Sequence, residues 1–201
     1  MSYSQYGEEP IILEFFHGRV GRFLDVGAYD GVRMSNTRRL AELGWEGLCI
    51  EPNPNLFLRL NALYGHGPVK TLCALVWPFH EVRTLHMNVD GLSTCIARVF
   101  EDLVDVGIAF SGVTYAPTVT PQTLATLGPW DFVSIDAEGA DVEIVLHGEA
   151  ILAGAQLLCV EKHNPISRQV DADVVRIREA CAERGFKTLV GETEGNLILA
   201  R

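Results

Sequence analysis

The sequence lacks the features that mark several large protein classes. No stretch approaches the roughly 20 apolar residues that span a bilayer, and residues 1–9 are too polar and acidic for a signal peptide. Internal repeats, low-complexity tracts and linkers are absent. We therefore expect no membrane span and a single domain over residues 1–201.

Basic residues are scarce. The chain has 16 Lys plus Arg against 26 Asp plus Glu, for a formal net charge of −10. Proteins that coat nucleic acids or anionic membranes need a basic face, so we expect no nucleic-acid partner. The charge does not exclude a nucleotide-like ligand, because backbone amides can hold one without net positive charge.

Cysteine pairs are also missing. The five cysteines are scattered, odd in number and include no C-x-x-C pair. Three of them lie in apolar runs and are predicted to be buried free thiols. A reducing, cytoplasmic environment is the expected compartment.

Apolar runs alternate with helical segments along most of the chain, which predicts an α/β fold with a doubly wound, mostly parallel sheet. The last two strands follow one another directly, so we expect an antiparallel pair at one edge. Residues 80–115 are predicted to hold two or three irregular or antiparallel strands, with a loop around 109–118. The predicted strands are 22–26, 48–51, 69–76, 131–136, 156–161, 186–190 and 195–199, and the helices are 11–16, 35–43, 55–64, 120–128, 141–152 and 171 or 173 to 184.

A glycine turn follows the first predicted strand, in the segment LDVGAYDG at 24–31. The spacing is G-x-x-x-G, which differs from the dinucleotide fingerprint G-x-G-x-x-G, and no G-K-[ST] follows. Asp25 and Asp30 place negative charge where a pyrophosphate would lie. This arrangement argues against a nicotinamide-dependent oxidoreductase and favours a ligand with a cationic centre.

An acidic residue, Glu51, ends the second predicted strand. A carboxylate in this position commonly accepts hydrogen bonds from two ribose hydroxyls. A ribose without phosphates, joined to a cationic centre, describes S-adenosylmethionine.

The chain resembles FkbM-type methyltransferases, a branch of the class I S-adenosylmethionine-dependent fold. Residues 78–117 match the family poorly, and this variable segment is where substrate recognition is expected. The segments that carry the resemblance are SQYGEE at 4–9, LDVGAYDG at 24–31, SNT at 35–37, GWEG at 44–47, IEPNP at 50–54, SIDAEGAD at 134–141 and GNLIL at 195–199.

The resemblance implies a Rossmann-like sheet of seven strands with one antiparallel strand near the edge. It implies S-adenosylmethionine as methyl donor and a hydroxyl acceptor on a sugar, a glycan or a natural-product scaffold. Residues 1–20 would form a helical segment that closes over the cofactor. The residues expected to contact the cofactor are Gln5, Tyr6, Asp25, Gly27, Ala28, Tyr29, Gly31, Ser35, Asn36, Glu51, Pro52, Ala74 and Asp136, with Cys73 and Leu75 as further candidates for the adenine wall.

The chemistry is expected where the fourth and fifth predicted strands of the main sheet end. Asp136 should project into the crevice, and Glu138 points the same way if strand geometry persists. A carboxylate there can accept a hydroxyl proton or bind Mg²⁺, which lowers the pKa of the acceptor. The alternative is that Asp136 caps the next helix.

Glu161, His163 and Asn164 follow the fifth strand. His163 is a candidate general base, and Asp136, Glu161 and Asn164 are candidate ligands of a divalent metal. The alternative is a solvated loop that ends at Pro165.

The favoured interpretation is an O-methyltransferase for a sugar or glycan hydroxyl, acting as a monomer or homodimer. A natural-product O-methyltransferase and a non-catalytic methyltransferase-like binding module are the alternatives.

Overall fold

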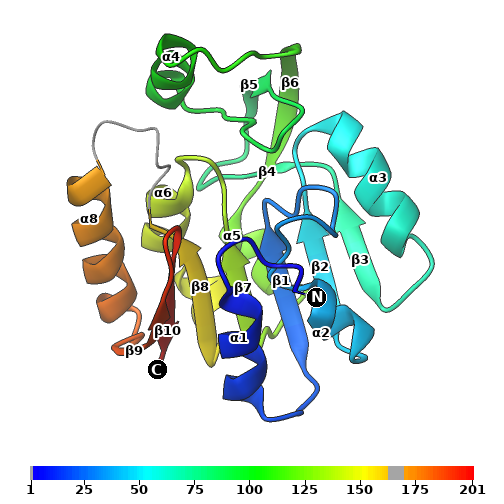
Figure 1. The fold of residues 1–201 in the computed structure, drawn as a ribbon, viewed down its shortest axis with the longest axis vertical. Helices are drawn as coiled ribbons and strands as arrows, with labels where there is room; N and C mark the ends of the chain where they lie inside the picture. The colour runs from blue at the N-terminus through cyan, green and yellow to red at the C-terminus, as the bar shows by residue number, and fades with distance from the viewer. Residues whose placement is uncertain (1, 163–169) are drawn as a thin grey trace.

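A seven-stranded sheet forms the centre of the protein, as the computed structural model of residues 2–162 and 170–201 shows (Figure 1). Only β10 runs antiparallel to its neighbours, β8 and β9. The predicted mostly parallel sheet with one antiparallel strand near the edge is confirmed. The strand order is β3 (Val69–Leu72), β2 (Glu46–Ile50), β1 (Arg22–Val26), β7 (Phe132–Ile135), β8 (Leu157–Glu161), β10 (Asn196–Ala200) and β9 (Thr188–Glu192).

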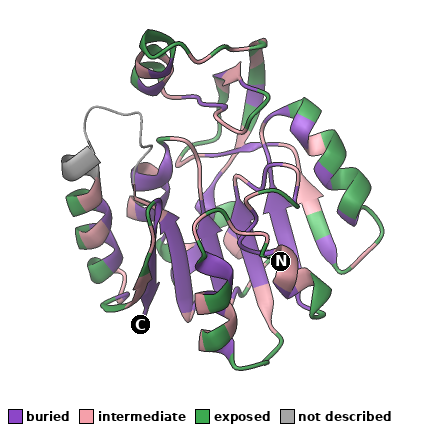
Figure 2. Ribbon diagram, in the orientation of Figure 1, coloured by how far each residue is buried: buried purple, intermediate pink, exposed green. Residues whose placement is uncertain are grey.

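Both faces of this sheet are covered by helices, which is why its central strands are almost entirely buried (Figure 2). Successive side chains on a strand point to opposite faces. Phe23 therefore packs into one core, and Leu24 packs into the other. One face carries α1 (Glu8–Phe16), α2 (Arg38–Glu42) and α3 (Pro54–Tyr64), and the other carries α5 (Pro121–Ala125), α6 (Asp141–Leu146), α7 (Glu149–Leu152) and α8 (Val170–Glu183).

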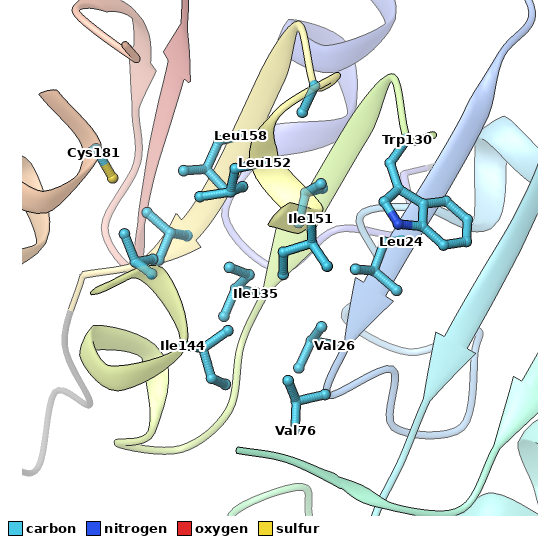
Figure 3. Close-up of a cluster of buried hydrophobic side chains, with 14 of the residues drawn as sticks. Leu24, Val26, Val76, Trp130, Ile135, Ile144, Ile151, Leu152, Leu158 and Cys181 are labelled. Carbon is cyan, nitrogen blue, oxygen red and sulfur yellow. The ribbon is translucent and has the colours of Figure 1, made fainter. Parts of the chain in front are cut away.

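The larger of these cores contains mainly aliphatic side chains (Figure 3). Leu24 and Val26 of β1 meet Ile144 of α6 and Ile151 of α7 within this cluster. Burying such a side chain contributes roughly 1.5–3 kcal/mol. The core therefore fixes the ends of the strands, which the glycine turn and the acidic residues directly follow.

A second, smaller sheet lies beyond one end of the main sheet, together with α4 (Figure 1). Its strand order is β4 (Leu75–Val76), β6 (Gly112–Val119) and β5 (Val82–Met87), and α4 spans Ala97–Asp105. A small core of its own, with Leu85 and Ala116 at its centre, holds this sheet together. The two antiparallel strands β5 and β6 confirm the prediction for the middle segment in outline.

Several predicted elements are corrected by the structure. The single strand predicted at 69–76 is two strands, because β3 pairs with β2 whereas β4 pairs with β6 in the other sheet. The loop predicted around 109–118 is wrong, because β6 occupies most of it. The helix predicted at 141–152 is interrupted at Gly148, and α4 was not predicted at all.

The predicted helix at 35–43 is also shorter than expected. The Ser35 hydroxyl accepts hydrogen bonds from the backbone N–H groups of Thr37 and Arg38, at 3.3 and 3.0 Å. This side-chain turn satisfies the backbone before the helix begins at Arg38.

All five cysteines are free thiols, and four of them are buried, one more than predicted. Among the helices that the structure describes, none has the length and apolar character needed to cross a membrane.

Candidate functional site

A cavity of about 340 Å³ opens at the carboxyl ends of the central strands, beside the small sheet. This volume lies in the range of small-molecule sites, about 300–1,000 Å³. The strand order reverses between β1 and β7, which is where doubly wound sheets bind ligands. The predicted residues that line the cavity are Gln5, Tyr6, Asp25, Gly27, Ala28, Tyr29, Ser35, Asn36, Glu51, Pro52, Ala74, Asp136, Glu138 and Glu161.

The glycine turn forms one wall of the cavity. Gly27 has φ +82°, and a Cβ atom there would lie 1.6 Å from the backbone oxygen of Asp136. The N–H groups of Gly27 and Ala28 both donate to the Ile50 carbonyl, at 2.9 and 3.0 Å. Only glycine permits this close approach between the loops after β1 and β7.

Glu51 is held by the backbone on both of its carboxylate oxygens. Tyr29 N–H donates to Oε2 at 3.0 Å, and Asn53 N–H donates to Oε1 at 2.8 Å. The side chain is only 5% exposed, and this burial raises its pKa to about 8 against the opposing effect of the two hydrogen bonds. Its orientation is therefore fixed before any ligand arrives.

A loop at 88–93 lies against the same wall, and the sequence did not predict its part in the cavity. The Asn53 side chain donates to the Asn88 carbonyl and to the Ser93 hydroxyl, at 3.1 and 3.0 Å. The Tyr29 hydroxyl donates to the Val89 carbonyl at 3.1 Å. The loop thereby brings Asp90, Gly91, Leu92 and Ser93 to the cavity.

Asp25 is a buried acid at the end of β1. It accepts a hydrogen bond of 2.5 Å from the Thr37 hydroxyl. Burial raises its pKa to about 6, and the Thr37 bond opposes this rise. Asn36 lies beside it and donates to the Ser134 hydroxyl at 3.3 Å.

Two further carboxylates lie side by side where β7 and β8 end. Ile135 pairs with Val160, so Asp136 and Glu161 take the next matching positions on the two strands. Among the described residues, neither carboxylate has a hydrogen bond or an ion pair. Removal from bulk water, followed by the charges of Asp141 and Asp25, raises the pKa of Asp136 to about 7. Burial and the charge of Asp136 likewise raise the pKa of Glu161 well above its usual range.

The loop after β7 is capped by Asp141 and not by Asp136. Asp141 accepts from the N–H groups of Ala137 and Gly139, at 2.8 and 3.1 Å. The alternative role of Asp136 as a helix cap is therefore wrong. The strand β7 ends at Ile135, before Asp136, and Glu138 takes a left-handed φ of +50°. Glu138 still lines the cavity.

The N-terminal segment is tied to β10 at the far side of the cavity. Glu8 is fully buried and accepts from the Thr193 hydroxyl at 2.6 Å and from Asn196 Nδ2 at 2.9 Å. The Tyr6 ring lies against Gly195, where a Cβ atom would come within 2.6 Å of it. These contacts place Gln5 and Tyr6 at the cavity.

A comparison with protein families identifies this arrangement. The family model described as "Methyltransferase FkbM domain" matches residues 25–188, well over half of the chain. The chain belongs to the FkbM methyltransferase family.

Solved structures agree with the fold of this member of the FkbM methyltransferase family. It is similar to an FkbM methyltransferase from Methylobacillus flagellatus KT, with a TM-score of 0.55 and 12% identity over 90% of this chain and 44% of that one. It is also similar to a TehB-like SAM-dependent methyltransferase from Corynebacterium glutamicum, with a TM-score of 0.50 and 12% identity over 98% and 88% of the two chains. The chain thus spans less than half the length of the first relative. No curated protein sequence matches it.

The residues of the FkbM domain fit S-adenosylmethionine in their chemistry. Gly27 leaves a backbone cradle that a side chain would fill. The described lining contains no Lys, Arg or His, which disfavours a phosphate-bearing cofactor and suits a cationic one. Glu51 offers an oriented carboxylate of the kind that accepts from ribose hydroxyls.

A metal ion finds less support. The described residues hold no group of three or more His, Cys, Asp or Glu side chains placed to bind one. Asp136 and Glu161 are adjacent, but His163 and Asn164 lie outside the described residues.

Two predicted contacts fall outside the cavity. Gly31 does not line it, because the loop turns there to pack on α3, where a Cβ atom would lie 2.7 Å from Leu60. Cys73 does not line it either, although Leu75 does. Sequence reasoning also missed Met34 and Asn196, and the only signal for Asn196 was a polar residue at the start of an apolar strand.

Proposed function

We propose that this FkbM methyltransferase transfers the methyl group to a hydroxyl oxygen, and that the hydroxyl belongs to a sugar or a glycan. The observation that carries this proposal is the pair formed by Asp136 and Glu161. Both carboxylates lie in the cavity without a protein partner among the described residues. A carboxylate whose pKa is near neutrality is suited to accept a hydroxyl proton.

The cofactor would lie between the glycine turn and the loop at 88–93. Glu51 would accept hydrogen bonds from the ribose hydroxyls, and Asp25 would face the amino end. Ala74 and Leu75 would form part of the adenine wall. Tyr6, with its hydroxyl hydrogen-bonded by Gln5 at 2.9 Å, would cover the methionine end.

When bound, S-adenosylmethionine supplies an electrophilic methyl group on a positively charged sulfur atom. Asp136 would hold the acceptor hydroxyl and take its proton as the new carbon–oxygen bond forms. Because its pKa is about 7, Asp136 is ionised and able to take that proton above neutral pH. Positioning of the oxygen in line with the methyl group supplies much of the remaining acceleration.

The acceptor end favours a molecule with several hydroxyl groups. Asp136, Glu138, Glu161 and Asn196, whose side chains carry carboxylate or amide oxygens, line the cavity. Such oxygens accept hydrogen bonds from the neighbouring hydroxyls of a sugar ring.

The test is methyl transfer to a panel of monosaccharides, oligosaccharides and natural-product scaffolds, with methyl-labelled S-adenosylmethionine. We expect label on a sugar oxygen, located by mass spectrometry and NMR. Asp136→Asn should lower turnover by about 10²–10⁴-fold. Glu149→Gln, an exposed charge removal outside the cavity, is the control.

Label on nitrogen or carbon would contradict the proposal, as would transfer only to natural-product scaffolds. Full turnover by Asp136→Asn would remove Asp136 from the proton transfer.

A further inference from the structure

The cavity is lined by more acidic side chains than the positive groups of its cofactor can pair with. Its described lining includes six acidic residues and no Lys, Arg or His. S-adenosylmethionine brings one sulfonium and one ammonium against one carboxylate, so most of these acids are left to face the acceptor or to bind protons. The six acids are Asp25, Glu51, Asp90, Asp136, Glu138 and Glu161.

These acids differ in the hydrogen bonds that the rest of the protein donates to them. Asp25 accepts from Thr37, and Glu51 accepts from two backbone N–H groups. The carboxylates of Asp136 and Glu161 have no hydrogen-bonding partner among the described residues, and the charge of Asp136 opposes ionisation of Glu161. Both carboxylates are therefore available to a ligand that donates hydrogen bonds and carries positive charge.

Asn196 provides a separate observation at the same place. It pairs with Glu161 across β10 and β8, and it is only 6% exposed. Its Nδ2 group donates to Glu8 at 2.9 Å, which fixes the orientation of the amide. Its Oδ1 atom is then left buried without a hydrogen bond in the described structure, although the residue lines the cavity. A buried acceptor of this kind indicates a missing donor.

We propose, on the basis of the proposed function, that Glu161 and Asn196 form a subsite for an amino group of the acceptor, with Asp136 beside it. The acceptor is then an amino sugar or another polyhydroxyl amine. An ammonium group donates up to three hydrogen bonds and accepts none, which matches an all-acceptor subsite. Its positive charge also offsets that of the two carboxylates.

The same subsite rejects acidic acceptors. A uronic acid or a sugar phosphate would bring a further negative charge next to Asp136 and Glu161, where no described cation lines the cavity. Like charges brought together in a partly buried site repel strongly, which selects against such molecules.

The experiment measures binding of three pyranoses that differ in charge to the protein saturated with S-adenosylhomocysteine. Glucosamine, N-acetylglucosamine and glucuronic acid are titrated by ligand-observed NMR at pH 7, where free glucosamine is largely protonated. We expect glucosamine to bind at least about tenfold more tightly than N-acetylglucosamine, and glucuronic acid to bind most weakly.

Glu161→Gln keeps the shape of the side chain and removes its ability to ionise. It should reduce the preference for glucosamine to less than about threefold, whereas Glu149→Gln should leave it unchanged. Asn196→Ala, the second variant, should weaken glucosamine binding without raising that of glucuronic acid. Thermal unfolding of each variant shows whether it is folded.

The inference is overturned if the three sugars bind equally, if none binds, or if Glu161→Gln keeps the full preference. Binding of S-adenosylhomocysteine separates this result from the proposed function. If S-adenosylhomocysteine does not bind, the proposed function itself fails. If it binds and the amine preference is absent, only the amine subsite fails.

Discussion

The carboxylates at the two ends of the cavity differ in their hydrogen bonds to the protein. Glu51, at the end of β2, has both oxygens hydrogen-bonded by backbone N–H groups. The carboxylate of Asp136, which follows β7, has no hydrogen-bonding partner among the described residues. Burial raises the pKa of both, to about 8 and about 7.

This difference in hydrogen bonding suits one carboxylate to ligand binding and the other to proton transfer. A carboxylate fixed by backbone bonds is oriented in advance, which suits recognition of a part of the cofactor that does not change. A carboxylate without partners is free to exchange a proton with a ligand, which suits the reacting end. The cost of such an unpaired acid is stability, and this cost can be measured.

The largest effect is expected at Gly27, where the loop after β1 contacts the loop after β7. In Gly27→Ala the new Cβ would overlap the Asp136 carbonyl, so we expect a loss of about 4 kcal/mol or more in the free energy of unfolding. Urea unfolding measures it. Gly44→Ala is the matched control, because Gly44 has a φ of +92° but open space around it. It should lose only about 1–2 kcal/mol. Equal losses would show that backbone conformation, and not contact between the loops, requires Gly27.

The unpaired acid should give a smaller, pH-dependent effect. The folded pKa of Asp136 lies above its unfolded value, so the folded state binds more protons, and its stability falls as pH rises from about 4 through 7. Asp136→Asn removes this loss. We expect the variant to be more stable than the wild type by up to about 4 kcal/mol at pH 8, because the pKa of Asp136 rises from 3.8 to about 7 and one pKa unit corresponds to about 1.4 kcal/mol. The difference should shrink toward pH 4. A destabilised variant at pH 8 would mean that Asp136 has a stabilising partner.

The smallest effect is expected in Tyr29→Phe, at the end of the cavity that holds Glu51. This change removes the hydroxyl that donates to Val89 and accepts from Arg33, at 3.1 and 3.0 Å. We expect a loss of about 0.5–1.5 kcal/mol in stability, with weaker binding of S-adenosylhomocysteine. Tyr115→Phe, at a side chain that is 76% exposed, should change neither. Unchanged binding in Tyr29→Phe would mean that the loop at 88–93 needs no anchor at Tyr29.

The sequence predicts the main sheet well, because its buried strands are short apolar runs separated by helices. Glu51 and Asp136 could be predicted as site residues because each directly follows such a run. Their contrasting environments could not be predicted, since backbone donors to Glu51 come from the folded loops. Asn196 shows the same limit, because its partner Glu8 lies 188 residues away in the chain.

The small sheet was harder to predict for a different reason. The strand β6 contains Pro117 and exposes alternate residues, so local sequence favours a loop there. Its pairing with β5 and β4, which are distant in sequence, decides its conformation. In α4, Val99 and Leu103 recur at helical spacing, but they are few among charged neighbours.

The most direct test of the division between the two ends is calorimetric titration with S-adenosylhomocysteine of the wild type, Glu51→Gln and Asp136→Asn. Glu46→Gln, at the exposed first position of the strand that Glu51 follows, is the control. The account predicts that Glu51→Gln weakens binding by at least about tenfold, whereas Asp136→Asn stays within about threefold of the wild type. Equal weakening by both changes, or unaltered binding by Glu51→Gln, would contradict it.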